Sequence, residues 1–143
     1  MSQFLNALDT QEVSDKLFEV IDHPFQYQSD EAKMVITVPI GFQTDFASVP
    51  RFPLIYALLG DTAHEPAVIH DWLYYSAIVN REIADNVLYE AMTVFGVEDW
   101  RRDMIYEGVR AGGWYAWDEH RKEGHPEIGK FGTSVIAQEK ESQ

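Results

Sequence analysis

The sequence predicts an α+β domain, with a small N-terminal antiparallel sheet followed by a helix hairpin and a third helix that glycines interrupt. Strand-favouring residues and turn sequences fill residues 16–46, and two prolines then break the pattern. From residue 65 onward the apolar residues recur with helical spacing. We expect residues 1–124 to form this single domain and residues 125–143 to form a polar C-terminal tail or arm.

Three stretches, "KLFEVI", "FQYQ" and "KMVITVPIGFQTDF", are predicted to supply the strands, and the turn sequences "DHP" and "SDEAK" join them. Within "MVITVP" the residues nearly alternate, so Val35 and Thr37 are expected on one side and Ile36 and Val38 on the other. Such alternation favours an antiparallel sheet with one face against a core.

The helix hairpin is predicted from its ends. Pro66 suits the first turn of a helix that runs to about Ala77. Asn80 is a good N-cap for a second helix, Arg81 to Phe95, and Gly96 is suited to end it. The short connector "IVN" favours antiparallel packing of the two helices.

A third helix is expected to start near Glu98 and to resume through "YAWDEHRKEG" after a weak point. Gly112 and Gly113, in "RAGGW", have low helix propensity and mark that point. The sequence therefore predicts a bend or break there rather than one long helix.

The composition fits one domain with ample core, since 45% of the 143 residues are apolar. No cysteine is present, which excludes disulfides, zinc–thiolate sites and thiol catalysis and favours a reducing compartment. The start "MSQFLNALDTQEVS" lacks the features of a signal peptide, and no apolar run reaches the roughly twenty residues of a transmembrane segment. The net charge of −13 predicts repulsion of phosphate backbones, so no nucleic acid partner is expected.

The candidate catalytic residues are His70, Tyr74 and Asp85. His70 and Asp71 lie side by side in the otherwise apolar run "AVIHDWLYYSA", and Tyr74 follows His70 by one helical turn. Asp85 lies among apolar residues of the second helix, within expected reach of His70 or Tyr74 across the hairpin. A buried carboxylate that holds a histidine fixes its tautomer and raises its basicity, as a general base requires.

The candidate metal ligands are Asp45 and Asp71. Asp45 lies in "GFQTDFASVPR", a loop that leaves the last predicted strand and also carries Thr44 and Ser48. Two carboxylates, with His70 as a third group, suit calcium, magnesium, manganese or zinc. We expect this loop to pack over the same cluster.

A purely structural interpretation of these groups stays open. His70, Asp71, Tyr74 and Asp85 could satisfy one another and fasten the hairpin, and Asp85 could instead pair with Arg81 on the surface. The crowding of polar groups among apolar ones favours a site, because burial of paired charges is about neutral for stability.

Four motifs, "VPIGFQTDFASVPR", "AVIHDWLYYS", "NREIADNVLYEAM" and "VRAGGWYAW", resemble the domain of unknown function 1353 family. The resemblance covers about Val38 to Trp117 and implies a phage or prophage origin, with no reaction attached. It also implies a location in the host cytoplasm or in a virion, and phage structural proteins or a host protein as partners.

A looser similarity connects "HDWLY" and the later "AD" with the His-Asp-x-x-Tyr and Asp pattern of secreted phospholipase A2. That similarity implies His70 as the base, Asp71 as a calcium ligand, and Tyr74 and Asp85 as groups that orient the histidine. It is a mechanistic analogy, because the glycine-rich calcium loop and the disulfides of that family are absent.

The leading functional hypothesis is a phage-type protein with a His-Asp site, a metal-assisted hydrolase that acts on lipid or cell-envelope ester or amide bonds. The first alternative is a virion- or tail-associated structural protein in which the same groups form a staple in the core. The second is an acidic inhibitor that binds a basic surface of a host protein and uses its charge for steering.

Overall fold

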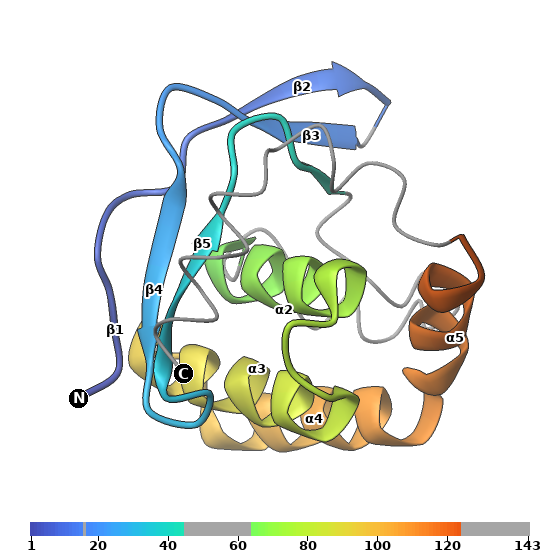
Figure 1. Cartoon of the computed structure of the whole chain (residues 1–143). Helices are drawn as coiled ribbons and strands as arrows, with labels where there is room; N and C mark the ends of the chain where they lie inside the picture. Colours follow the sequence, from blue (N-terminus) through green and yellow to red (C-terminus); the bar gives the residue numbers. More distant parts are fainter. Residues whose placement is uncertain (16, 45–63, 124–143) are drawn as a thin grey trace.

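The computed structural model describes residues 1–15, 17–44 and 64–123, and these form an α+β fold with the strands first and the helices after them (Figure 1). The strands are β1 (Gln3–Phe4), β2 (Thr10–Ser14), β3 (Leu17–Val20), β4 (Phe25–Ser29), β5 (Met34–Val38) and β6 (Gln43–Thr44). The helices are α2 (His64–Ser76), α3 (Arg81–Phe95), α4 (Asp99–Gly112) and α5 (Trp114–Glu123). The predicted fold class is confirmed.

The strands form two small antiparallel sheets, ordered β1–β4–β5 and β2–β3–β6. In the first sheet Phe25 is opposite Val38 and Tyr27 is opposite Ile36. The sequence predicted a single small sheet and did not identify β1 or β2. The two extra strands are short or mostly exposed, so they lack the apolar alternation by which the others are recognised.

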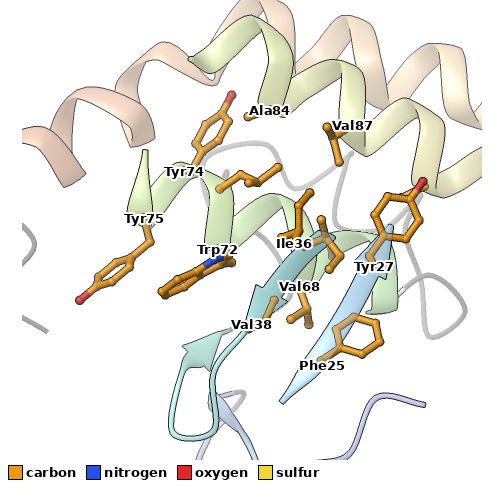
Figure 2. Packing of buried hydrophobic residues seen from close by; sticks show 14 of the residues in the cluster. Phe25, Tyr27, Ile36, Val38, Val68, Trp72, Tyr74, Tyr75, Ala84 and Val87 are labelled. Atoms are coloured by element: carbon orange, nitrogen blue, oxygen red, sulfur yellow. The ribbon is translucent and has the colours of Figure 1, made fainter. Parts of the chain in front are cut away.

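The core lies between the β4–β5 face and α2 (Figure 2). The alternate residues Phe25, Tyr27, Ile36 and Val38 are fully buried, as the period of two in a strand requires. The predicted grouping of Ile36 with Val38 is therefore confirmed. Figure 2 shows Val38 beside Val68 of α2, and the Tyr27 ring directed toward α3.

Helix α2 is the central helix, and every residue from Pro66 to Tyr75 is buried. The β4–β5 sheet lies on one side of it and α3 on the other (Figure 1). A helix that is surrounded in this way has no solvent face on which to place polar side chains. The imidazole of His70 and the carboxyl group of Asp71, both in this buried stretch, therefore need partners inside the fold.

The predicted hairpin of α2 and α3 is confirmed, together with its caps. The side chain of Asn80 accepts a hydrogen bond from the backbone of Ile83 at 2.8 Å. Gly96 follows α3 in the left-handed conformation, with φ 96°, and its N–H reaches the carbonyls of Met92 and Thr93. Ala77, with φ 53°, ends α2 immediately before the connector.

Glu90 fastens the far end of α3 to the first sheet. Its Oε1 accepts hydrogen bonds from the hydroxyls of Tyr27 and Ser29, both at 2.8 Å. Its Oε2 accepts from the backbone N–H of Glu31 at 2.9 Å, in the turn between β4 and β5. The contact is not predictable from the sequence, because Glu90 has the features of an ordinary polar residue of an amphipathic helix.

The predicted glycine interruption is confirmed. Gly113 is needed there because neighbouring atoms leave no room for a side chain. Gly113 separates α4 from α5 with helical dihedral angles, φ −64° and ψ −18°. A methyl group at Gly113 would lie 2.5 Å from the carbonyl oxygen of Val109 and would also collide with the hydroxyl of Tyr74. The missing side chain thus lets the α4–α5 corner close over α2.

Within residues 1–15, 17–44 and 64–123, no helix is both long and apolar enough to cross a membrane. The predicted C-terminal tail, residues 125–143, lies outside the described residues and stays a prediction.

Candidate functional site

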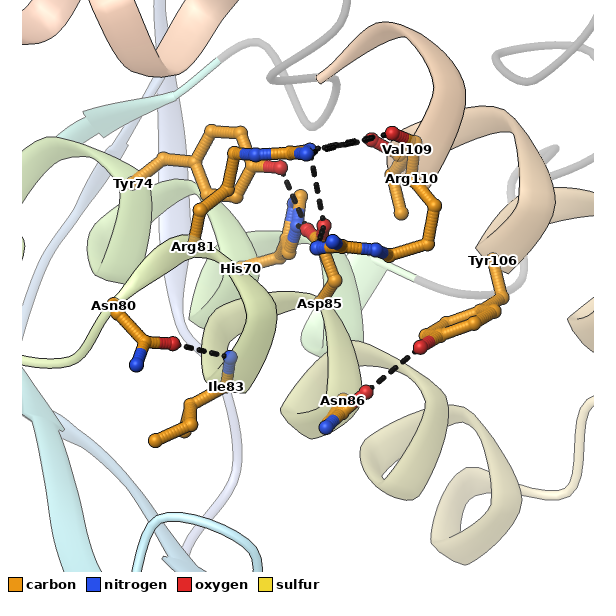
Figure 3. Close-up of polar contacts among 10 residues, drawn as sticks. All are labelled: His70, Tyr74, Asn80, Arg81, Ile83, Asp85, Asn86, Tyr106, Val109 and Arg110. Carbon is orange, nitrogen blue, oxygen red and sulfur yellow. Dashed lines mark hydrogen bonds and ion pairs between the residues drawn. The ribbon is translucent and has the colours of Figure 1, made fainter. Parts of the chain in front are cut away.

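The candidate site is a cluster of five side chains from three helices, hereafter the polar cluster: His70, Tyr74, Arg81, Asp85 and Arg110 (Figure 3). His70 and Tyr74 lie one turn apart on α2, so both point toward α3. Asp85 lies on the facing side of α3, as the short connector predicted. The predicted proximity of these three residues is confirmed, whereas their catalytic role stays a prediction.

One carboxylate oxygen of Asp85 accepts hydrogen bonds from both His70 and Tyr74 of α2. Nε2 of His70 lies 2.8 Å from Oδ1, and the hydroxyl of Tyr74 donates to the same atom at 2.6 Å. The two rings lie 4.2 Å apart between centroids, and Trp117 of α5 meets the Tyr74 ring edge-on. The aromatic contacts hold the two donors in place.

The other carboxylate oxygen of Asp85 accepts hydrogen bonds from two guanidinium groups. Nη1 of Arg110 donates to Oδ2 at 2.8 Å and Nη1 of Arg81 at 3.3 Å. A carboxylate offers about four acceptor positions in total. The four side chains around Asp85 therefore use its acceptor capacity.

Arg81 also ties α3 to the C-terminal end of α4. Its Nη1 donates to the carbonyl of Val109 at 3.1 Å, and both terminal nitrogens reach the carbonyl of Arg110 at 3.5 Å. The last carbonyls of a helix lack partners within it, and a cation near them is favoured by the helix dipole. The predicted alternative of a surface Arg81–Asp85 pair is wrong in its location, because Asp85 is fully buried.

Burial and charge set the protonation states of the cluster. Burial acts to raise the pKa of Asp85, but hydrogen bonds and charge from His70, with hydrogen bonds from Tyr74 and Arg110, bring that pKa below its ordinary value. Asp85 is therefore ionised and only accepts hydrogen bonds, so Nε2 of His70 carries the hydrogen that faces it. Burial, followed by the charge of Asp85, raises the pKa of the Tyr74 hydroxyl, which stays protonated.

Asp71 points elsewhere. Its Oδ2 accepts a hydrogen bond from the hydroxyl of Thr44, at the end of β6. The Tyr74 hydroxyl is directed at Asp85 rather than at Asp71. Successive helical residues are rotated by about 100°, so His70 and Asp71 face different neighbours. Only the start of the predicted loop, Thr44, is thereby shown near α2.

The metal hypothesis falls partly outside the described residues. Asp45, the first proposed ligand, and Ser48 both lie there. In the part of the chain that the structure describes, no group of three or more His, Asp or Glu side chains is arranged to hold a metal ion. The ligand set of Asp45 and Asp71 stays a prediction.

Sequence reasoning missed Arg110. The residue lies in the motif "VRAGGWYAW", but nothing in its own helix indicates a buried acceptor. The available signal was a count of donors, since a carboxylate offers about four acceptor positions and His70, Tyr74 and Arg81 fill three of those on Asp85.

Fold and site define a class: an α+β protein in which a buried carboxylate joins three helices behind a small sheet. The chain belongs to the family described as "Protein of unknown function (DUF1353)", which matches residues 19–109. The matched region begins within β3 and ends within α4, and it includes four of the five residues of the polar cluster. Arg110 lies one residue beyond it. No curated protein and no solved structure matches the chain.

Proposed function

We propose that this protein acts by binding other proteins, as a phage-type virion- or tail-associated structural protein, and that the polar cluster is a staple in its core. The observation that carries the proposal is the state of Asp85, which is fully buried and accepts hydrogen bonds from four side chains. No acceptor capacity is left on that carboxylate for a ligand. The cluster connects α2, α3 and α4, so its contacts stabilise the packing of these helices.

Energetics support this interpretation. A buried ion pair contributes little net stability over apolar packing, but removal of one partner costs about 3–5 kcal/mol. Any alternative arrangement of the three helices that separates Asp85 from its arginines or its histidine therefore carries a large free-energy cost. A protein that must present a fixed surface to a partner benefits from such specificity.

A metal-assisted hydrolase is the second candidate, and the His70–Asp85 distance of 2.8 Å favours it. Because Nε2 of His70 faces Asp85, the base would be Nδ1, and Asp85 would stabilise the imidazolium formed when a water loses its proton. Asp71, with Asp45, would hold the ion, and lipid or cell-envelope esters and amides would be the substrates. His70 is only 2% exposed, so this function also requires an opening beside α2.

His70→Gln separates the two functions, because glutamine keeps an N–H donor for Asp85 and removes the base. We expect the wild-type protein to hydrolyse p-nitrophenyl esters and phospholipid vesicles no faster than the variant. Diethylpyrocarbonate should modify the partly exposed His23, His64 and His120 in the native protein well before the buried His70. Turnover that is lost in a folded His70→Gln variant would establish the hydrolase instead.

A further inference from the structure

The outward face of α4 carries a stripe of exposed residues. Trp100, Met104, Glu107 and Ala111 follow at helical spacing and are all exposed, and Trp114 continues the series at the start of α5. The inward face of α4 is different, with Ile105 and Val109 buried. We call these five residues the α4 stripe.

The exposure of this stripe is large for its residue types. Trp100 is 50% exposed, Met104 44% and Trp114 55%. Trp and Met are enriched at protein interfaces, where they bury large apolar areas. Single exposed apolar residues need no explanation, but Trp100 and Met104 on α4, followed by Trp114 at the start of α5, form a series that suits a binding surface.

The charge around the stripe is unbalanced. The three arginines of α4 are engaged: Arg101 with Glu98, Arg102 with Asp99, and Arg110 with Asp85. Glu107, in the middle of the stripe, has no ion-pair partner among the described residues, and neither has Asp118 on α5. A partner that covers the stripe must supply a cation for Glu107, since an unpaired buried carboxylate is costly.

The same geometry disfavours a second copy of this chain as the occupant. In a pair of stripes related by a two-fold axis through their middle, which gives the largest overlap, the central residue of one meets the central residue of the other. Glu107 would then face Glu107, and the net charge of −13 adds to the repulsion.

We propose that the α4 stripe is a docking surface for a partner protein that presents apolar side chains around a lysine or arginine. The proposal rests on the binding role proposed above and names the surface and the partner chemistry. Trp100, Met104 and Trp114 supply apolar anchors, Glu107 selects the cation, and the acidic chain steers a basic partner.

A charge swap tests this surface directly. The probes are two synthetic amphipathic leucine helices that differ in one central residue, lysine or glutamate, titrated against the full chain by calorimetry. We expect at least 10-fold tighter binding of the lysine peptide, a reversed preference in Glu107→Lys, and loss of both affinities in Met104→Glu. Ile40→Glu is the matched control, since Ile40 is 48% exposed on another part of the chain, and it should bind as the wild type does.

Other results would overturn the proposal. Equal affinity for the two peptides, a preference that Glu107→Lys leaves unchanged, or equal loss in Ile40→Glu would each exclude the stripe as the docking surface. Sedimentation that shows a dimer, dissociated by Met104→Glu, would assign the face to self-association. These outcomes are independent of the ester and vesicle assays on His70→Gln, so failure of the docking surface is distinguishable from failure of the binding role.

Discussion

Nη1 of Arg110 lies 2.8 Å from Oδ2 of Asp85 and joins α4 to the hairpin of α2 and α3. This contact adds a third helix to the cluster, because a His-Asp pair alone would connect only two helices. With Arg81 on the same oxygen, the carboxylate of Asp85 connects three helices and stabilises their mutual orientation.

Removal of the cations should destabilise the fold. We expect Arg110→Ala to lower the free energy of unfolding by about 1–3 kcal/mol, since the buried carboxylate loses a charged donor while Arg81 remains. Asp85→Ala should cost about 3–5 kcal/mol, because several buried donors lose their acceptor at once. Urea denaturation followed by circular dichroism measures both. Glu98→Ala, which breaks a surface ion pair, should change stability by less than about 1 kcal/mol, and an equal loss there would contradict the assignment.

Gly113 should tolerate no side chain while Tyr74 keeps its hydroxyl. Gly113→Ala places a methyl group against that hydroxyl and against the carbonyl of Val109, and should destabilise the protein by about 1–3 kcal/mol. Tyr74→Phe removes one of the two obstacles. The double variant should therefore lose less stability than the sum of the single variants, as a double-mutant cycle would show. Strict additivity would mean that the two positions are not in contact.

The hairpin was predictable because its signals are local. Asn80, Gly96 and the short connector specify where α3 begins and ends, and burial of the apolar faces then brings Asp85 opposite His70. The chain near these positions carries all the information that the prediction needed.

The rest depends on packing between distant segments. Arg110 and Gly113 matter only because α4 and α5 close over α2, and no residue within α4 indicates that approach. The structural interpretation grouped Asp71 with Tyr74 and Asp85, but proximity along a helix does not say where a tyrosine hydroxyl will find its strongest acceptor. Asp85 supplied that acceptor, and Thr44 of a distant strand supplied the donor to Asp71.

Acid should weaken the protein through Asp85. Its pKa in the folded state lies below the ordinary value of 3.8, so at pH values between the two the unfolded chain binds more protons than the folded one. The stabilising contribution is present above about pH 4 and is lost as the pH falls through the folded value. Unfolding free energies measured from pH 6 to pH 2 should fall more steeply for the wild type than for Asp85→Asn. Parallel profiles would show that Asp85 does not carry the effect.

Alkali should act through Tyr74 and Tyr27. Burial raises the pKa of each hydroxyl above its ordinary value of 10.0, and the neighbouring carboxylates, Asp85 and Glu90, act in the same direction. Above pH 10 the unfolded chain loses these protons while the folded chain keeps them, so stability falls as the pH rises. Tyr74→Phe should flatten the decline between pH 9 and pH 11. An unchanged slope in Tyr74→Phe would contradict the prediction.

Metal ions should leave stability unchanged if the polar cluster is a staple. An ion that binds only the folded state raises the melting temperature by mass action, so the hydrolase hypothesis predicts a saturable rise at millimolar concentration. The structural proposal instead predicts melting temperatures within about 1 °C after EDTA treatment and after return of calcium, magnesium, manganese or zinc. Asp71→Asn is the matched variant, because asparagine keeps an oxygen to accept the Thr44 hydrogen bond and removes the charge that a cation needs. A rise seen in the wild type and lost in Asp71→Asn would place an ion at this carboxylate and favour the hydrolase over the structural role.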